Sequence, residues 1–128
     1  MKYNNFYQIY DILYASKDYK KECEFLLECI GEHKNILDVG CGTGVHSSML
    51  SAKSKNVVGI DICDKMISVA NTNYSHVGNL RFHTTSVESF SAEAQEKYDA
   101  IICLFNVINH INNLESLMMF FKSCTSLL

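Results

Sequence analysis

The sequence predicts an α/β domain built on a parallel sheet. Short apolar runs alternate with amphipathic helical patterns along the 128 residues, as in successive βαβ units. The first run, residues 36–39, leads into a glycine-rich turn, and the second, residues 57–60, ends at the carboxylate of Asp61. This is the separation expected between the two strand ends of one βαβ unit. We therefore expect three layers, with helices on both faces of a sheet of order 3-2-1-4 and right-handed crossovers.

Composition narrows the classes of function. Fourteen acidic and 11 basic residues give a net charge of −3, so the chain lacks the basic surface that nucleic acid binding requires. No apolar run approaches the roughly 18–20 residues that span a bilayer, and residues 1–7 are too polar for a signal peptide. We expect a cytoplasmic protein with neither nucleic acid nor membrane as a partner.

The cysteines predict neither a disulfide nor a metal site. Six are present, with no C-x-x-C pair and no histidine at ligand spacing. We expect reduced thiols that pack as small apolar side chains.

The N-terminal part predicts an arm followed by a helix. Residues 1–15 are rich in aromatic side chains and form an amphipathic arm. Ser16 or Asp18 offers an N-cap, and Gly31 offers a C-terminal stop. Between them, side chains that recur at helical spacing would pack on the sheet: Tyr19, Cys23, Leu26 and Ile30.

Two further helices are expected around the second strand. One begins at Val45, after the glycine turn, and continues to about Lys53. Asp64 is expected to cap the other, which ends near Tyr74.

The C-terminal half completes the alternation. Strands are expected at residues 80–84 and 100–105, with a polar loop or short helix at 91–97 between them. Asn112 or Asn113 would cap a final helix. Its inward residues are expected to be Leu114, Leu117, Met118, Phe121 and Leu127.

The glycine turn distinguishes two classes of nucleotide site. A dinucleotide fingerprint would need its third glycine at position 45, which is Val45, whereas this chain has Gly44 and the pattern D-x-G-x-G-x-G. Asp38, which opens that pattern, would repel a pyrophosphate but attract a ligand that carries an ammonium and a sulfonium group. The spacing therefore predicts a cation-bearing nucleoside.

The second strand end supplies complementary groups. Asp61 can accept both hydrogen bonds of a ribose 2′,3′-diol. Ile62 and Met66 are apolar and close enough in sequence to sandwich an adenine ring. Taken alone, Asp61 could equally be a surface carboxylate.

Three segments of the chain resemble a known family. DVGCGTG at 38–44, GIDICDKMI at 59–67 and YDAIICLF at 98–105 are similar to the main motifs of class I S-adenosylmethionine-dependent methyltransferases. The resemblance runs from about residue 8 to residue 128. YDILY at 10–14, KDY at 17–19 and GTGVH at 42–46 most resemble small-molecule enzymes that N-methylate nucleotide-linked amino sugars.

The resemblance implies a role for each matching residue. Asp38 and the turn would hold the methionine part of S-adenosyl-L-methionine, Asp61 the ribose, and Val87 N–H the adenine edge. Ser86 stands where members usually carry an aspartate, so adenine selection would be looser. Leu104, Phe105 and Asn106 would line the methyl-transfer pocket. The full set of cofactor candidates is Asp38, Gly40, Cys41, Gly42, Gly44, His46, Asp61, Ile62, Met66, Ser86, Val87, Leu104, Phe105 and Tyr19.

Methyl transfer itself makes small demands on the protein. It is an in-line displacement at an activated carbon, so proximity, alignment and exclusion of water matter most. A general base is needed only for a protonated nucleophile. His110 is the first candidate and Tyr14, which would close the pocket, the second; alternatively, His110 only caps a turn or packs in the pocket wall. His46 lines the pocket or lies outside it.

The chain is short for such an enzyme. We expect one domain over 1–128: an N-terminal arm and helix at 1–31, and a Rossmann-like core at 35–128 that stops before a fifth strand. Strand 100–105 would then lie at an edge. We expect the N-terminal part of a longer enzyme, or a sheet completed by a second copy or a partner chain.

Two functions follow from this sequence. The first is methyl transfer to a small molecule, possibly to the nitrogen of an amino sugar. The alternative is a non-catalytic, truncated nucleoside-binding module or partner subunit. Residues 118–121 are assigned to the core, with a partner or membrane face as the other interpretation.

Overall fold

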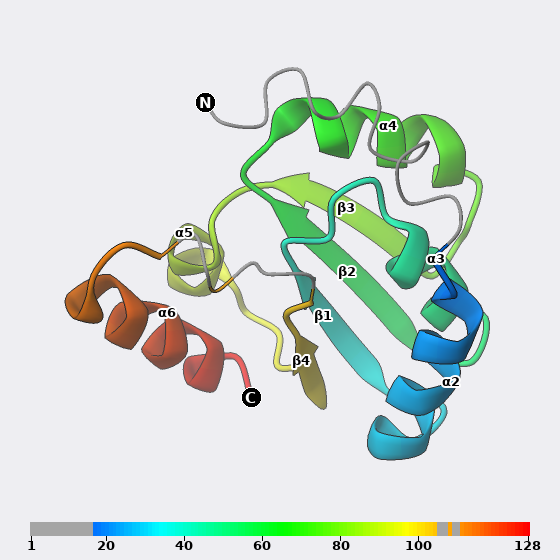
Figure 1. Cartoon of the computed structure of the whole chain (residues 1–128), viewed down its shortest axis with the longest axis horizontal. Coiled ribbons are helices and arrows are strands. Elements are labelled where there is room, and N and C mark those ends of the chain that lie inside the picture. The colour runs from blue at the N-terminus through cyan, green and yellow to red at the C-terminus, as the bar shows by residue number, and fades with distance from the viewer. Residues whose placement is uncertain (1–16, 105–107, 109–110) are drawn as a thin grey trace.

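The computed structural model describes residues 17–104, 108 and 111–128. Its four strands are all parallel and lie in the order β3-β2-β1-β4, so the predicted fold class and sheet order are confirmed (Figure 1). The N-terminal arm, Tyr14, Phe105, Asn106 and His110 lie outside the described residues. The elements in chain order are α2 (Tyr19–Ile30), β1 (Asn35–Val39), α3 (Val45–Ser51), β2 (Asn56–Asp61), α4 (Asp64–Tyr74), β3 (Leu80–Thr84), α5 (Val87–Glu93), β4 (Ala100–Ile102) and α6 (Leu114–Ser126).

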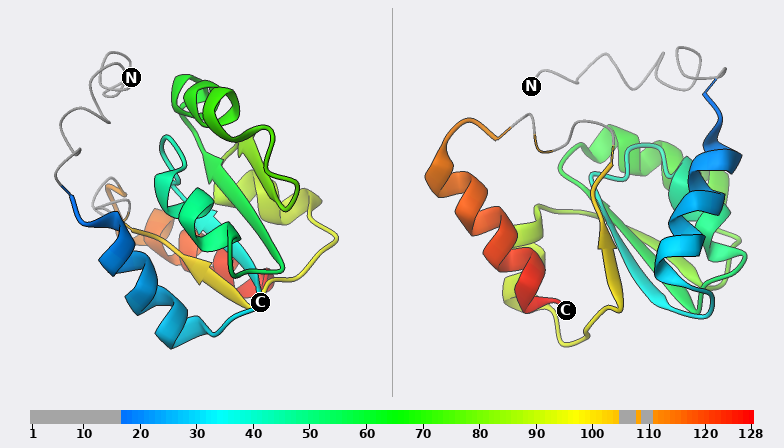
Figure 2. Two further views of the ribbon diagram at one scale, coloured as in Figure 1. Left: turned by 90° about the vertical axis from the view of Figure 1, so that its right-hand side faces the viewer. Right: turned by 60° about the horizontal axis from the view of Figure 1, so that its bottom comes forward.

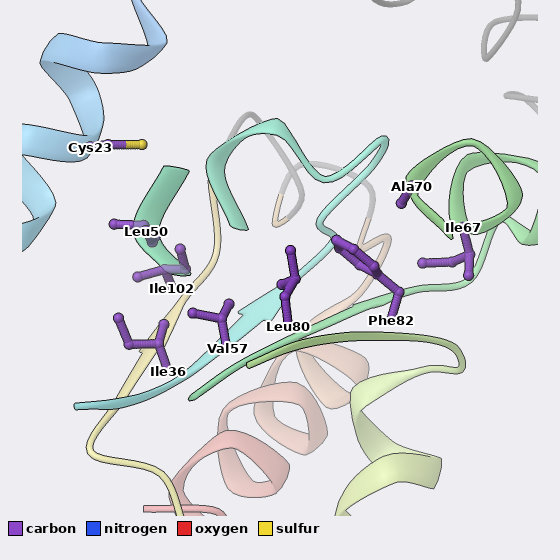
Figure 3. Packing of buried hydrophobic residues seen from close by; sticks show 9 residues of the cluster. All are labelled: Cys23, Ile36, Leu50, Val57, Ile67, Ala70, Leu80, Phe82 and Ile102. Atoms are coloured by element: carbon purple, nitrogen blue, oxygen red, sulfur yellow. The ribbon is translucent and has the colours of Figure 1, made fainter. Parts of the chain in front are cut away.

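Helices cover both faces of the sheet. Helices α2, α3 and α4 lie on one face, and α5 and α6 lie on the other (Figures 1 and 2). Alternate residues of each strand point to opposite faces, so Ile36 of β1 packs with the first group and Leu37 with the second. Figure 3 shows the first core, which contains Cys23, Ile36, Leu50, Val57, Ile67, Ala70, Leu80, Phe82 and Ile102.

Helix α2 forms as its caps predict. The Asp18 side chain accepts a hydrogen bond from Lys21 N–H at 3.0 Å, and Gly31 ends the helix with a φ of 92°. Cys23 is the buried member of its inward stripe. Helix α2 therefore joins the sheet layer through one face.

Three expected boundaries are wrong. The N-cap of α4 is Cys63, and Asp64 is its first residue. Helix α5 begins at Val87 rather than 91, because Ser86 accepts a hydrogen bond from Ser89 N–H and caps it. Strand β4 covers three residues rather than 100–105, because only Ala100–Ile102 pair with β1. Cys103 and Leu104, which follow, are half-buried and lie outside the strand. Among residues 100–104 only Ile102 is buried, so this apolar run predicted neither the length of the strand nor its burial.

The inward face of α6 also differs from the prediction. Phe120 and Leu127 are buried, whereas Leu114, Met118 and Phe121 are 71%, 64% and 49% exposed. Asn113 is confirmed as the N-cap, accepting from Ser116 N–H. The helix is apolar on more than one face, so spacing alone could not decide which face the sheet would cover. Of residues 118–121, only Phe120 belongs to the buried core.

The described cysteines are all free thiols. Cys23 and Cys63 are buried, Cys29 is exposed, and the other three are half-buried. Among the described residues, no helix is long and apolar enough to cross a membrane, and no cluster of three or more acidic, histidine or cysteine side chains could hold a metal ion.

Candidate functional site

The glycine turn connects the carboxyl end of β1 to α3. Gly40, Gly42 and Gly44 have φ angles of 74°, 57° and 86°, which side chains other than glycine rarely adopt. The N–H groups of Gly40 and Cys41 both donate to the carbonyl of Ile60, at 2.8 and 3.0 Å. The turn is therefore fastened to the end of the neighbouring strand, β2.

Phe82 of β3 fills the space beneath this turn. A Cβ atom on Gly44 would lie 2.6 Å from Phe82 Cζ, and one on Gly59 would lie 2.7 Å from Phe82 Cδ1 and 2.9 Å from Cys41 Sγ. Figure 3 shows the ring beside α4 and the turn. Gly44 is thus required by packing as well as by its φ. Phe82 was not predicted to be part of this region, because it lies on a strand 38 residues after Gly44 in the sequence.

Asp38 is a buried carboxylate at the end of β1. Only 2% of its surface is exposed, and Ser47 Oγ donates a hydrogen bond to its Oδ2 at 2.7 Å. Burial raises the pKa of Asp38 to about 6, with the Ser47 hydrogen bond opposing this rise and Asp61 adding to it. Ser47 was not predicted, since a serine inside a helix carries no distinct sequence signal.

Asp61 occupies the matching position at the end of β2. Its Oδ2 accepts from Gly42 N–H at 2.9 Å, and its Oδ1 accepts from Cys63 N–H at 2.9 Å. These bonds fix the carboxylate against the turn, and each oxygen can still accept a further hydrogen bond. The side chain is half-buried, so its position at the strand edge suits contact with a ligand.

The two candidate adenine contacts differ in accessibility. Ile62 directly follows Asp61 and is 60% exposed, whereas Met66 is 4% exposed and belongs to the inner side of α4. Ile62 therefore offers an apolar face beside the Asp61 carboxylate. The free thiol of Cys41 lies in the turn itself, where burial, Asp38 and Asp61 raise its pKa well above the ordinary value.

His46 connects α3 to α2. Its Nε2 lies 3.1 Å from Glu22 Oε1, and its ring makes an edge contact with Tyr19, with centroids 4.9 Å apart. Glu22 also pairs with Lys17 Nζ at 3.1 Å. Burial lowers the pKa of His46 despite its hydrogen bond to Glu22. The predicted residues Tyr19 and His46 thus lie together, and Glu22, which was not predicted as a site residue, joins them in one network.

The remaining candidates lie after β3 and β4. Ser86 caps α5 and Val87, which is buried, begins it. The first N–H groups of any helix lack acceptors within it, so Val87 N–H suits an outside acceptor. Thr85 N–H donates to the Asp61 carbonyl at 3.0 Å, which places the end of β3 beside that of β2. Leu104 is half-buried against the first core.

These residues fit a cation-bearing nucleoside. Two carboxylates, Asp38 and Asp61, flank the turn at the carboxyl ends of adjacent strands, where ligands of open parallel sheets bind. Their mutual repulsion contributes to the raised pKa of Asp38, so a positive ligand group would be stabilised beside them and a phosphate would not. The exposed side chain of Ile62 supplies an apolar surface next to them.

Comparisons with known proteins agree with this arrangement. The family described as "Methyltransferase domain" matches residues 36–128. A ubiquinone biosynthesis O-methyltransferase from Nitrosomonas europaea is 31% identical over 106 residues, 80% of this chain and 43% of that protein. The chain spans about a third to two-fifths of the length of such curated relatives.

Solved structures share the fold over nearly the whole chain. A S-adenosylmethionine-dependent methyltransferase from Clostridium acetobutylicum is 30% identical with a TM-score of 0.79, covering 100% of this chain and 54% of that one. An amino pentose methyltransferase from Micromonospora echinaspora, solved with S-adenosylmethionine bound, has a TM-score of 0.81 at 22% identity and covers 94% and 51%. With the family match over most of its length, this chain belongs to the methyltransferase-domain family, within the class I S-adenosylmethionine-dependent methyltransferases.

Proposed function

We propose that this chain supplies the cofactor half of an enzyme that transfers a methyl group from S-adenosylmethionine to a small molecule. The observation that carries the proposal is the pair of carboxylates, Asp38 and Asp61, on either side of the glycine turn. A buried acidic group is costly in the free protein and is best explained by a cationic ligand.

Each part of the cofactor has a matching group. The Asp38 carboxylate and the turn would hold the charged methionine end, and Asp61 would accept the ribose hydroxyls. Ile62 would cover one adenine face, and Val87 N–H would donate to its edge. The sulfonium supplies an activated methyl carbon, so the chain contributes binding, alignment and exclusion of water.

For the acceptor we propose the nitrogen of an amino sugar. Two observations support this. The sequence at residues 10–14, 17–19 and 42–46, which include Tyr14, Tyr19 and His46, resembles that of sugar N-methyltransferases, and Tyr19 and His46 are in contact. The chain also shares its fold with the amino pentose methyltransferase. Tyr14 would close the pocket and His110 would accept a proton where the amine arrives protonated.

A hydroxyl oxygen is the second candidate acceptor. It is favoured by sequence identity with several ubiquinone biosynthesis O-methyltransferases, at 35% and 31% for two of them. A hydroxyl nucleophile must lose its proton, so this reaction would depend on a general base more strongly than attack by a neutral amine.

Calorimetric titration with S-adenosylhomocysteine tests the cofactor assignment, and absence of heat at millimolar ligand would refute it. Mass spectrometry after incubation of the full-length gene product with S-adenosylmethionine and either a nucleotide-linked amino sugar or a catechol then tests the acceptor. Methylated sugar alone supports N-methylation, and methylated catechol alone contradicts it.

We also propose that the outer edge of β4 pairs with another strand, from a second copy or a partner chain. Among the described strands, β4 contacts only β1, so its other edge has free backbone groups. The neighbouring face of α6 exposes Met118 and Leu114, which such a partner would cover.

A further inference from the structure

The serine hydroxyls of α3 divide into two kinds. Ser48 and Ser51 each donate to a backbone carbonyl three residues earlier, at 2.9 and 2.6 Å, which is the usual local bond of a helical serine. Ser47 differs, because its Oγ donates at 2.7 Å to the Asp38 carboxylate on another element. Ser47 is also fully buried, so this bond is formed away from water.

Asp38 lies in surroundings that oppose its ionisation. Among the described residues, the titratable groups that interact electrostatically with it are Asp61 at the end of β2, Cys41 in the turn, Cys23 on α2 and Cys103 after β4. Each would carry no charge or a negative one, so they add nothing that favours a carboxylate anion. The Ser47 hydrogen bond favours the anion against burial and against Asp61.

We propose that Ser47 is a positioning residue that keeps Asp38 ionised and thereby sets the pH range in which the site binds its cationic cofactor. This inference rests on the proposed function. Protons and the cofactor's positive group compete for the same carboxylate. Below the pKa of Asp38, affinity should therefore fall by up to about tenfold per pH unit.

Loss of the Ser47 hydroxyl should shift the pH range of cofactor binding upward. In Ser47→Ala the carboxylate keeps its burial and its neighbour Asp61 but loses its donor, so Asp38 should take up a proton at higher pH. We expect the midpoint of the affinity profile to rise by on the order of one pH unit.

Calorimetric titration with S-adenosylhomocysteine from about pH 5 to about pH 8.5 measures these profiles, a range that brackets the Asp38 pKa of about 6. Ser51→Ala is the matched control, because it removes a buried hydroxyl from the same helix without touching Asp38. The proposal predicts a shifted profile for Ser47→Ala, an unshifted one for Ser51→Ala, and restoration by Ser47→Thr. Equal profiles for wild type and Ser47→Ala, or equal shifts in both alanine variants, would overturn it.

A ligand-free measurement separates this proposal from the proposed function. NMR titration of the Asp38 carboxyl carbon should show a higher midpoint in Ser47→Ala than in wild type, and an unchanged midpoint refutes the role of Ser47. Failure of wild type to bind S-adenosylhomocysteine at any pH refutes the cofactor assignment instead. If Ser47→Ala does not fold, Ser47→Cys, which is similar in size but a weak donor, replaces it in both measurements.

Discussion

At the scale of single residues, the buried carboxylate of Asp38 lowers the stability of the ligand-free protein. Asp38 is nearly inaccessible to water and has a raised pKa, so its ionised form makes the ligand-free protein less stable. Ser47 reduces this cost without removing it. A carboxylate in such a position indicates a ligand-binding role, because a neutral residue would serve the fold better.

Asp38→Asn should therefore stabilise the ligand-free protein and weaken S-adenosylhomocysteine binding. The pKa rises from an ordinary value of 3.8 to about 6, so wild type loses stability as pH increases between these values and gains none back above them. The variant avoids this loss, which amounts to about 3 kcal/mol at neutral pH. Urea unfolding at about pH 4 and pH 7.5 measures it.

Asp64→Asn is the control for the Asp38→Asn measurement. Asp64→Asn changes an exposed carboxylate on α4, and its effect should be within about 0.5 kcal/mol at both pH values. If Asp38→Asn and wild type had the same free energy of unfolding at neutral pH, the proposed destabilisation by the buried Asp38 charge would be wrong.

Asp61→Ala should weaken S-adenosylhomocysteine binding by roughly 2 kcal/mol or more, through loss of a charge-assisted bidentate contact. The same change removes the acceptor of Gly42 N–H and Cys63 N–H, so part of the effect would come from a loosened turn. Asp61→Asn retains an acceptor oxygen for one of these groups and should lose less affinity than alanine. Calorimetry on both variants checks this, and an unchanged affinity in Asp61→Ala would refute the ribose assignment.

At the scale of elements, the turn depends on its packing against β3. The Phe82 ring occupies the space that side chains at Gly44 and Gly59 would need. Gly59 has no positive φ, so its requirement for glycine is steric alone.

Gly59→Ala should lower the free energy of unfolding by about 1–3 kcal/mol, because its Cβ would overlap Phe82 and Cys41. Phe82→Leu in the same chain should relieve part of the overlap. Gly78→Ala is the matched control, since its Cβ would meet nothing within 4 Å, and it should change stability by no more than about 1 kcal/mol. Equal effects of the two single alanine variants in thermal unfolding would contradict the packing role of Phe82.

Two adjacent residues of α6 test which face of that helix is inside. Phe120→Ala should cost about 3–5 kcal/mol, because its buried ring packs with the core beside α5. Phe121→Ala, at a half-exposed position, should cost less than about 1 kcal/mol. Similar losses in urea unfolding would show that both faces of α6 are covered.

At the scale of the whole molecule, the described chain contains the strand ends that suit a cofactor and an edge that suits a partner. Strands β1 and β2 lie inside the sheet, whereas β4 lies at an edge among the described strands. Helix α6, which carries the exposed apolar residues, lies on the same side of the sheet as α5, whereas α3, which carries Ser47, lies on the other side (Figures 1 and 2).

Size-exclusion chromatography at several concentrations tests pairing through this edge. Exposed apolar residues beside free strand groups predict a concentration-dependent dimer or higher species. A monodisperse monomer at all concentrations would count against the proposed pairing.

The sequence by itself determined the fold class, the sheet order and the position of the turn. Alternating burial in a strand and the spacing of Asp38 from Gly44 are local features, which depend on residues close together in the sequence. The N-caps were narrowed to Ser16 or Asp18 and to Asn112 or Asn113, and the structure decided for Asp18 and Asn113. The sequence also assigned the family through three short segments.

Contacts between distant residues were decided only by the tertiary structure. Three contacts each join two elements whose relative orientation no local pattern specifies. They are the hydrogen bond from Ser47 to Asp38, the packing of Phe82 beneath Gly44, and the hydrogen bond between Glu22 and His46. The covered face of α6 was decided in the same way, because a helix that is apolar on several sides is oriented by what it packs against. The turn therefore indicates the cofactor from sequence alone, whereas the groups that tune its carboxylates become known only when the strands and helices are brought together.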